Sequence, residues 1–347
     1  MDIILHIGAH RCATGSLMAY LEGNAPALAA QGIAVWGPQR ARGGVLAGVI
    51  PGPGPLSAAR QCARAAGRIA LHLDRVERQG ARHLLISAPH LLGAPAAALR
   101  AGRLYPWAGA RLAQVVAGFG GRLDRIVLTI RAPEAYWRSV IAMTVMQGHA
   151  LPDPAALARL AAQPRSWQDL IAEQAEAAPG VDLLILPHER FAALPDRRLA
   201  QMLAPSGDPA TPDLALPPDR QRPWRNRGPE AAALHRALAL DGAPPPAPAV
   251  PWCPFTPPQR AALEERYHDD LFWLHAGAHG RARLATDPWP DATPGPDIFR
   301  SNRQAPAGAP QTGPHGVAQT GRIDPRARLR QRGQGDDIEE GRMGQAG

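Results

Sequence analysis

One short segment near the start of the chain, residues 3–21 (IILHIGAHRCATGSLMAYL), constrains the fold more than any other. An apolar run at residues 3–7 predicts a buried strand, small residues dominate from 8 to 15, and Ser16 opens a stretch with helical apolar spacing. A loop of small residues before a helix lets several N–H groups point at one spot, where the helix dipole favours negative charge. The segment therefore predicts an anion-binding strand–loop–helix unit.

The loop also carries suitable donor side chains. Arg11 adds a permanent cation, and Thr14 and Ser16 add hydroxyl groups. The pattern G-x-x-x-x-G-K-[ST] of nucleotide triphosphatases is approached but not met, because no Lys precedes Ser16. An ordinary turn between a strand and a helix is the alternative interpretation. It would require the cation, the hydroxyl groups and the helix start to coincide by chance.

The rest of the chain alternates between apolar runs and helical patterns. Strands are predicted at residues 32–36, 83–87, 125–131 and 181–186, and helices at 57–79, 107–119, 133–146, 154–162, 166–178, 195–203, 229–240 and 257–275. This alternation indicates an α/β fold with a doubly wound, mostly parallel sheet, a P-loop-like first turn and helices on both faces. Periodicity ends near residue 285. We therefore expect one domain over residues 1–284 and a disordered, low-complexity tail over residues 285–347.

Composition limits the kind of ligand. The chain has 347 residues, 45% of them hydrophobic, and contains no lysine, so all 38 of its basic side chains are Arg. Eight Arg balance eight acidic residues in residues 285–347, which leaves the net charge of +8 within residues 1–284. This charge suits an anionic ligand bound by guanidinium groups. Nucleic acid is not expected as a partner, because few aromatic side chains are interspersed with the Arg residues.

Other sequence signals bear on location and metal binding. Three widely spaced cysteines, Cys12, Cys62 and Cys253, indicate neither a disulfide framework nor a Cys-rich metal site. The start of the chain lacks the pattern of a secretory signal, and no apolar run reaches the roughly 18 residues that a membrane span needs. We therefore expect a cytoplasmic protein with no transmembrane segment.

A second candidate anion anchor lies in the middle of the chain. Arg131 ends the predicted strand 125–131, and Ser139 follows eight residues later on the next predicted helix. Arg at the carboxyl end of a parallel strand is well placed to bind an anion. The alternative interpretation is that Arg131 only caps the sheet edge and that Ser139 fills a position inside a helix.

Both segments resemble parts of the sulfotransferases that use 3′-phosphoadenosine 5′-phosphosulfate (PAPS), especially the bacterial branch of that family. Residues 8–16 (GAHRCATGS) resemble its 5′-phosphosulfate loop, and residues 131–139 (RAPEAYWRS) resemble its 3′-phosphate-binding segment. In outline the resemblance extends over residues 1–280. It implies an enzyme that transfers a sulfuryl group from PAPS to a hydroxyl or amine of a small-molecule or glycan acceptor. No metal is required in such a reaction.

The resemblance also implies roles for individual residues. The expected PAPS-binding residues are Arg11, Cys12, Ala13, Thr14, Gly15, Ser16, Arg131 and Ser139. Arg11 is also expected to act in catalysis. Many relatives carry a carboxylate in the loop after the third strand, but this chain has none there and places His90 next to that position. His is a competent base near neutral pH, so His90 is the expected catalytic base and His10 the second candidate; a loop histidine without a partner is the alternative.

Two other functions remain open. The missing carboxylate is compatible with a catalytically inactive, sulfotransferase-like protein that only binds a nucleotide. A P-loop kinase or other nucleotide triphosphatase is less favoured, because such enzymes hold Mg²⁺ with an Asp at a strand end. Here the residues at the ends of the predicted strands are Ser87, Arg131 and Pro187, and none of them is an Asp.

Overall fold

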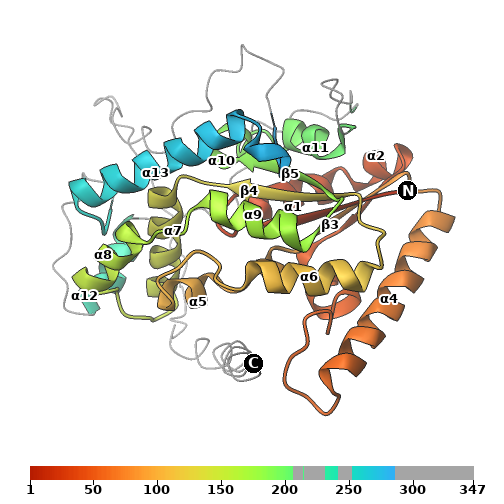
Figure 1. Ribbon diagram of the computed structural model, residues 1–347, viewed down its shortest axis with the longest axis horizontal. Coiled ribbons are helices and arrows are strands. Elements are labelled where there is room, and N and C mark those ends of the chain that lie inside the picture. Colours follow the sequence, from red (N-terminus) through yellow and green to blue (C-terminus); the bar gives the residue numbers. More distant parts are fainter. Residues whose placement is uncertain (206–213, 215–230, 241–251, 286–347) are drawn as a thin grey trace, which may run out of the picture.

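The computed structural model describes residues 1–205, 214, 231–240 and 252–285 (Figure 1). Within these residues the chain forms one sheet of six parallel strands in the order β2-β3-β1-β4-β5-β6. The strands are β1 (Asp2–Gly8), β2 (Ile33–Trp36), β3 (His83–Ser87), β4 (Arg125–Ile130), β5 (Asp182–Pro187) and β6 (Arg283–Leu284). The predicted α/β class is therefore confirmed.

Helices connect the strands, and local sequence signals account for many of their ends. The helices are α1 (Thr14–Gly23), α2 (Ala25–Ala30), α3 (Pro38–Arg40), α4 (Ala58–Arg78), α5 (Pro95–Arg100), α6 (Ala108–Phe119), α7 (Pro133–Met146), α8 (Pro154–Ala162), α9 (Trp167–Ala177), α10 (His188–Phe191), α11 (Pro195–Leu203), α12 (Ala231–Leu240) and α13 (Pro257–His275), with shorter turns η1 (Ala41–Val45), η2 (Pro89–Leu92) and η3 (Ala278–Gly280). Pro133 starts α7 because a proline is tolerated at the first helical position. Thr256 and Gln259 form a capping box that starts α13.

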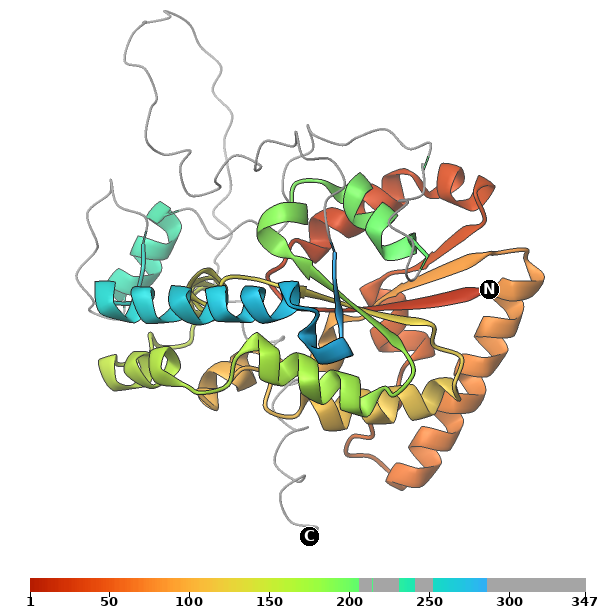
Figure 2. The same cartoon turned by 45° about the horizontal axis from the view of Figure 1, so that its top comes forward.

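Side chains on the two faces of the sheet belong to two separate apolar clusters. In β1, for example, Ile3, Leu5 and Ile7 pack into the larger cluster, whereas Ile4 packs into the smaller one. Helices α4, α6, α7, α9 and α13 contribute to the larger cluster, and α1, α2, α10 and α11 contribute to the smaller one. Figure 2 shows α1, α2 and α11 on the opposite side of the strands from α6 and α9. Both faces are thus covered, which explains why the strands are apolar nearly throughout.

Several elements differ from the sequence-based expectation. Helix α1 begins at Thr14 rather than Ser16, because Ala13 takes the N-cap position in a left-handed conformation. Residues 39–55, for which the sequence predicts no helix or strand, contain part of α3 and all of η1. Helix α5 and the two-residue strand β6 were not predicted. Ala285, the first residue of the predicted tail, is buried and donates its N–H to Ile185 O at 2.8 Å.

The parallel arrangement sets the location of the candidate site. Because all six strands run in one direction, the loops that follow β1, β3, β4 and β5 leave the same edge of the sheet. β1 lies between β3 and β4, so its loop is flanked by the segments that contain His90 and Arg131. Among the described helices, none combines the length and hydropathy needed to span a membrane. The predicted tail from residue 286 onward lies outside the described residues.

Candidate functional site

The loop between β1 and α1 has an unusual backbone. Arg11 and Ala13 both adopt left-handed conformations, with φ of 61° and 57°. Gly8 has φ of 109°, and a Cβ at this position would come within 3.3 Å of both His10 N and Pro89 Cβ. Non-glycine residues seldom adopt positive φ, and left-handed residues occur in loops whose backbone N–H groups form a concave surface. The backbone conformation of this loop is therefore compatible with anion binding.

The start of α1 adds a buried hydroxyl group next to this loop. Within the described residues, no side chain caps the first turn of α1. The Thr14 hydroxyl oxygen is sealed from solvent and makes no hydrogen bond to the described residues. Buried hydroxyl groups nearly always have a partner, so an unpartnered one in the first turn of a helix is a candidate ligand contact.

Arg11 brings the two sequence-predicted anchors into direct contact. Its Nε donates to Ser139 Oγ on α7 at 2.9 Å. Its carbonyl oxygen accepts from Arg131 Nη1 at 2.7 Å. Burial and the nearby Arg131 lower the pKa of Arg11 from its ordinary value, but a guanidinium remains charged at neutral pH. The structure therefore gathers Arg11, Arg131 and Ser139 at one place.

Arg131 is held between the loop and the neighbouring helices. Its carbonyl oxygen accepts from Trp167 Nε1 at 2.8 Å. Its Nε is buried and has no hydrogen-bond partner among the described residues. Burial is the main cause that lowers the pKa of Arg131. The next residue, Ala132, donates its N–H to Glu189 Oε1 at 2.9 Å, and Glu189 Oε2 accepts from the Tyr267 hydroxyl at 2.7 Å.

Arg198 on α11 is part of the site but was missed from the sequence. Its Nη1 donates to Cys12 O at 3.0 Å, and its Nη2 lies 2.7 Å from Thr129 Oγ1 and 3.0 Å from His6 Nε2. His6 Nδ1 in turn lies 3.1 Å from Ser87 Oγ. A guanidinium only donates hydrogen bonds, so His6 Nε2 accepts and the ring is neutral. A polar network therefore joins the loop to β1, β3 and β4.

A sequence signal for Arg198 did exist. Arg198 and Met202 are four residues apart, so they share one face of α11. Met202 and Arg198 are both fully buried. Arg is rarely buried without a partner, so an Arg on an apolar helical stripe is itself a candidate site residue.

Cys12 does not behave as a nucleophile. It is fully buried, and burial raises the pKa of its thiol to about 12 despite three nearby guanidinium groups. The reactive form of cysteine is the thiolate, which is scarce at neutral pH when the pKa is so high. The contact of Cys12 that the structure shows is through its backbone, since its carbonyl oxygen accepts from Arg198 Nη1.

The two histidines of the predicted site lie close together. His90 is on η2, directly after β3, and it is one of the groups that lower the pKa of His10. Burial, followed by His90 and Arg11, lowers the pKa of His10 to about 3. Burial, followed by Arg42 and Arg111, lowers the pKa of His90 to about 4. His90 is therefore a weaker base than an ordinary histidine, whose pKa is near 6.5.

Tyr105 holds His10 in place. The Tyr105 hydroxyl lies 3.1 Å from the His10 N–H nitrogen and 3.0 Å from His10 Nδ1, and the two rings stack with centroids 5.9 Å apart. Tyr105 itself has φ of 42°, and Arg165 Nη2 donates to its carbonyl oxygen at 3.2 Å. Arg165 is bound in turn to Glu173 on α9. His10 is thus positioned by residues from outside the loop.

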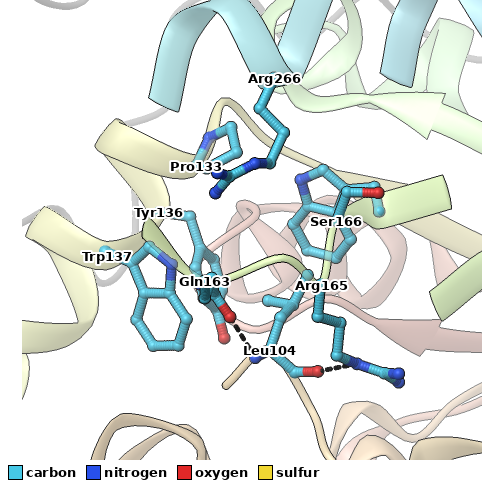
Figure 3. Close-up of a pocket in the computed structure, with 9 residues that line it drawn as sticks. Leu104, Pro133, Tyr136, Trp137, Gln163, Arg165, Ser166 and Arg266 are labelled. Carbon is cyan, nitrogen blue, oxygen red and sulfur yellow. Dashed lines mark hydrogen bonds between the residues drawn. The ribbon is translucent and has the colours of Figure 1, made fainter. Parts of the chain in front are cut away.

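A small hollow lies behind this network (Figure 3). Its lining residues come from α7, α9, α13 and the connections between α5 and α6 and between α8 and α9: Leu104, Pro133, Tyr136, Trp137, Gln163, Arg165, Ser166, Trp167 and Arg266. It has room for about one water molecule. The hollow is therefore too small for an acceptor molecule. Among the described residues, no group of three or more His, Cys, Asp or Glu side chains is gathered as metal ligands.

The site is defined by its own geometry: a concave loop, three guanidinium groups, a buried hydroxyl and two neutral histidines at the carboxyl edge of the sheet. Comparison with known proteins finds no family model, no curated protein and no solved structure that matches the chain.

Proposed function

We propose that this chain is a sulfotransferase that moves a sulfuryl group from PAPS to a hydroxyl or amine of a small-molecule or glycan acceptor. The observation that carries the proposal is the contact between the two predicted anchors. Arg11, from the segment that resembles a 5′-phosphosulfate loop, donates to Ser139, from the segment that resembles a 3′-phosphate site. PAPS carries anionic groups at both positions, so one ligand would occupy both anchors.

The unpartnered buried groups fit a ligand of this kind. Thr14 Oγ1 and Arg131 Nε are each sealed from solvent without a hydrogen-bond partner among the described residues. In the proposal, residues 11–16 and the Thr14 hydroxyl hold the 5′-phosphosulfate, while Arg131 and Ser139 hold the 3′-phosphate. This assignment takes the sheet as doubly wound, with a P-loop-like turn after β1 and the ligand at the strand ends. We also propose a cytoplasmic protein that needs no metal.

The proposed chemistry assigns two side chains to the reaction. The acceptor oxygen or nitrogen forms a bond to sulfur while the bond from sulfur to the bridging oxygen of the donor breaks. Arg11 and the loop N–H groups stabilise the negative charge that develops on the departing bisphosphate. The acceptor proton passes to His90, whose ring is neutral at pH 7 because its pKa is about 4.

A second function is favoured by the same observation on His90. A group with a pKa of about 4 is a weak base, and this loop has no carboxylate in its place. A catalytically inactive protein that binds the nucleotide would need Arg11, Arg131 and Ser139 but no base. Nucleotide binding without turnover over a panel of phenol, amine and sugar acceptors would favour this alternative.

Thermal stabilisation separates these functions from a nucleotide triphosphatase. A ligand at 100 times its Kd stabilises the native state by about 2.7 kcal/mol. We expect adenosine 3′,5′-bisphosphate to raise the Tm by several degrees, and ATP with Mg²⁺ to raise it much less. Adenosine 5′-phosphate serves as the control that lacks the 3′-phosphate. A larger effect of ATP with Mg²⁺ would contradict the proposal.

A further inference from the structure

A fully buried cation lies directly beneath the loop. Arg198 is 1% exposed, and its Nε is sealed from solvent without a hydrogen-bond partner in the described part of the chain. Among the described residues, no Asp or Glu forms an ion pair with it; its partners are Cys12 O, Thr129 Oγ1 and His6 Nε2. Burial lowers the pKa of Arg198 to about 10, so the group stays protonated at neutral pH. Its positive charge is therefore not balanced by the groups around it.

Two other buried Arg side chains, both outside the loop region, do have carboxylate partners. Arg125 is 6% exposed, and its Nε donates to Asp182 Oδ2 at 2.6 Å. Arg165 is 5% exposed and binds Glu173 through both terminal nitrogens. Burying a charge is strongly unfavourable unless it is paired, which explains these two arrangements. Arg198 departs from the rule at the position where an anion is expected.

Arg198 and Arg131 also orient the loop backbone. Arg131 Nη1 binds the Arg11 carbonyl, and Arg198 Nη1 binds the Cys12 carbonyl. In a trans peptide the N–H points opposite to the C=O of the same unit. The N–H groups of Cys12 and Ala13 therefore point away from the two guanidinium groups. Consecutive backbone N–H groups that converge on one point bind an oxyanion, and these two are candidates for that role.

We propose that Arg198 belongs to the anion site rather than to the core: it orients the loop through Cys12 O and supplies a buried charge that only an anion in the loop balances. The inference rests on the proposed function in that the 5′-phosphosulfate end of the donor is the anion. It predicts an unusual pair of effects. The charge lowers the stability of the empty protein and raises its affinity for anions.

Matched substitutions at two buried arginines test this inference. Arg198→Met removes the charge at similar volume, Arg198→Lys keeps a charge, and Arg125→Met removes a buried guanidinium whose partner is Asp182, at the opposite end of the strands. For each variant we would measure the Tm without ligand and the affinities for inorganic sulfate and for adenosine 3′,5′-bisphosphate by calorimetry. Sodium chloride at equal ionic strength controls for screening.

We expect Arg125→Met to lower the Tm and leave both affinities unchanged, because it removes the buried contacts of Arg125 with Asp182 Oδ2 and Met202 O, away from the loop. Arg198→Met should lower the ligand-free Tm less than Arg125→Met does, because removing the uncompensated charge offsets the loss of its hydrogen bonds to Cys12 O, Thr129 Oγ1 and His6 Nε2. It should weaken the binding of both anions about tenfold or more, since two unit charges within about 10 Å interact by more than a decade in binding constant inside a protein. Arg198→Lys should recover most of the affinity. A ligand-free Tm that falls as far in Arg198→Met as in Arg125→Met, with both affinities retained, would overturn the inference.

Two further measurements keep the test decisive. If Arg198→Met does not fold, the wild-type protein still allows a test. Sulfate should raise the wild-type Tm well beyond the rise caused by chloride at equal ionic strength. An equal rise with the two salts would overturn the inference. The two ligands separate this inference from the proposed function. Sulfate binding that depends on Arg198, with no preference for the bisphosphate over adenosine 5′-phosphate, supports the inference and contradicts the function. Tight bisphosphate binding that does not depend on Arg198 supports the proposed function and contradicts the inference.

Discussion

Arg11 and Ser139, 128 residues apart in the chain, are joined by a hydrogen bond of 2.9 Å from Nε to Oγ. Arg11 belongs to the loop after β1, and Ser139 lies in α7, after β4. The contact exists because β1 and β4 are neighbours in a parallel sheet, so the loop and the helix leave the same edge. It places a cation and a hydroxyl group from two separate motifs within reach of one ligand.

Ser139→Ala should weaken the binding of adenosine 3′,5′-bisphosphate far more than the binding of adenosine 5′-phosphate. Loss of a charge-assisted contact to the 3′-phosphate corresponds to about 1.5 to 3 kcal/mol, or roughly ten- to a hundredfold in Kd. Arg131→Ala should show the same preference and also weaken adenosine 5′-phosphate, because Arg131 holds the loop carbonyl of Arg11. Calorimetric titration measures both, with Ser57→Ala as a control at a remote helix cap. An equal loss of affinity for the two nucleotides in Ser139→Ala would contradict the assignment of this residue to the 3′-phosphate site.

Arg11→Ala should abolish transfer from PAPS while the nucleotide product still binds with moderate affinity. The reason is that the guanidinium acts mainly on charge that develops at the bridging oxygen in the transition state. Arg11→Lys keeps the charge but has a different donor geometry, so it should retain part of the turnover. Single-turnover kinetics with labelled PAPS measure the step. Turnover close to wild type in Arg11→Ala would show that the loop backbone alone is sufficient.

His90→Ala should lower kcat by roughly a hundredfold or more without comparable loss of nucleotide affinity. The structure also sets the pH range. Below about pH 4 the ring is protonated and cannot accept a proton, so kcat should fall with decreasing pH only through that value and stay level above it. Arg42 is exposed and helps to lower this pKa, so Arg42→Gln should move the acid limb to higher pH. An acid limb that persists unchanged in His90→Ala would assign the base to another group.

His10 should remain a neutral imidazole with its proton on Nε2 throughout the physiological range. The Tyr105 hydroxyl accepts from the His10 backbone N–H, so its own proton is available for Nδ1. The ¹⁵N chemical shifts of the ring report the tautomer directly, and a pKa of about 3 predicts no titration near pH 6.5. Tyr105→Phe should allow the ring proton to populate Nδ1 as well. Tyr267→Phe, which removes a hydroxyl bound to Glu189, should leave the tautomer unchanged. A proton on Nδ1 in the wild-type protein would contradict the assignment.

The sequence by itself determined those elements whose signals are local. Helix α7 begins at Pro133 and ends at Met146 as predicted, because a proline at the first position and a continuous apolar stripe define it within one segment. Strand β3 has its predicted limits, and α11 and α13 do as well, for similar reasons. The loop residues 8–16 were singled out because strand, small residues, cation and hydroxyl groups follow one another directly. Each of these inferences needs only neighbours in the chain.

Tertiary structure alone decided the features that depend on distant groups. β6 is two residues long and exists because Leu184 and Ile185 of β5 offer it a free edge, a partner that no local pattern reveals. Arg198 lies 186 residues from Cys12, and only the packing of α11 on the smaller core brings the two together. The pKa of His90 falls to about 4 because folding buries it beside Arg42 and Arg111. Desolvation and charge proximity are properties of the packed chain. The sequence therefore determines the chemical type of each residue, whereas the tertiary structure determines its pKa and its charge state.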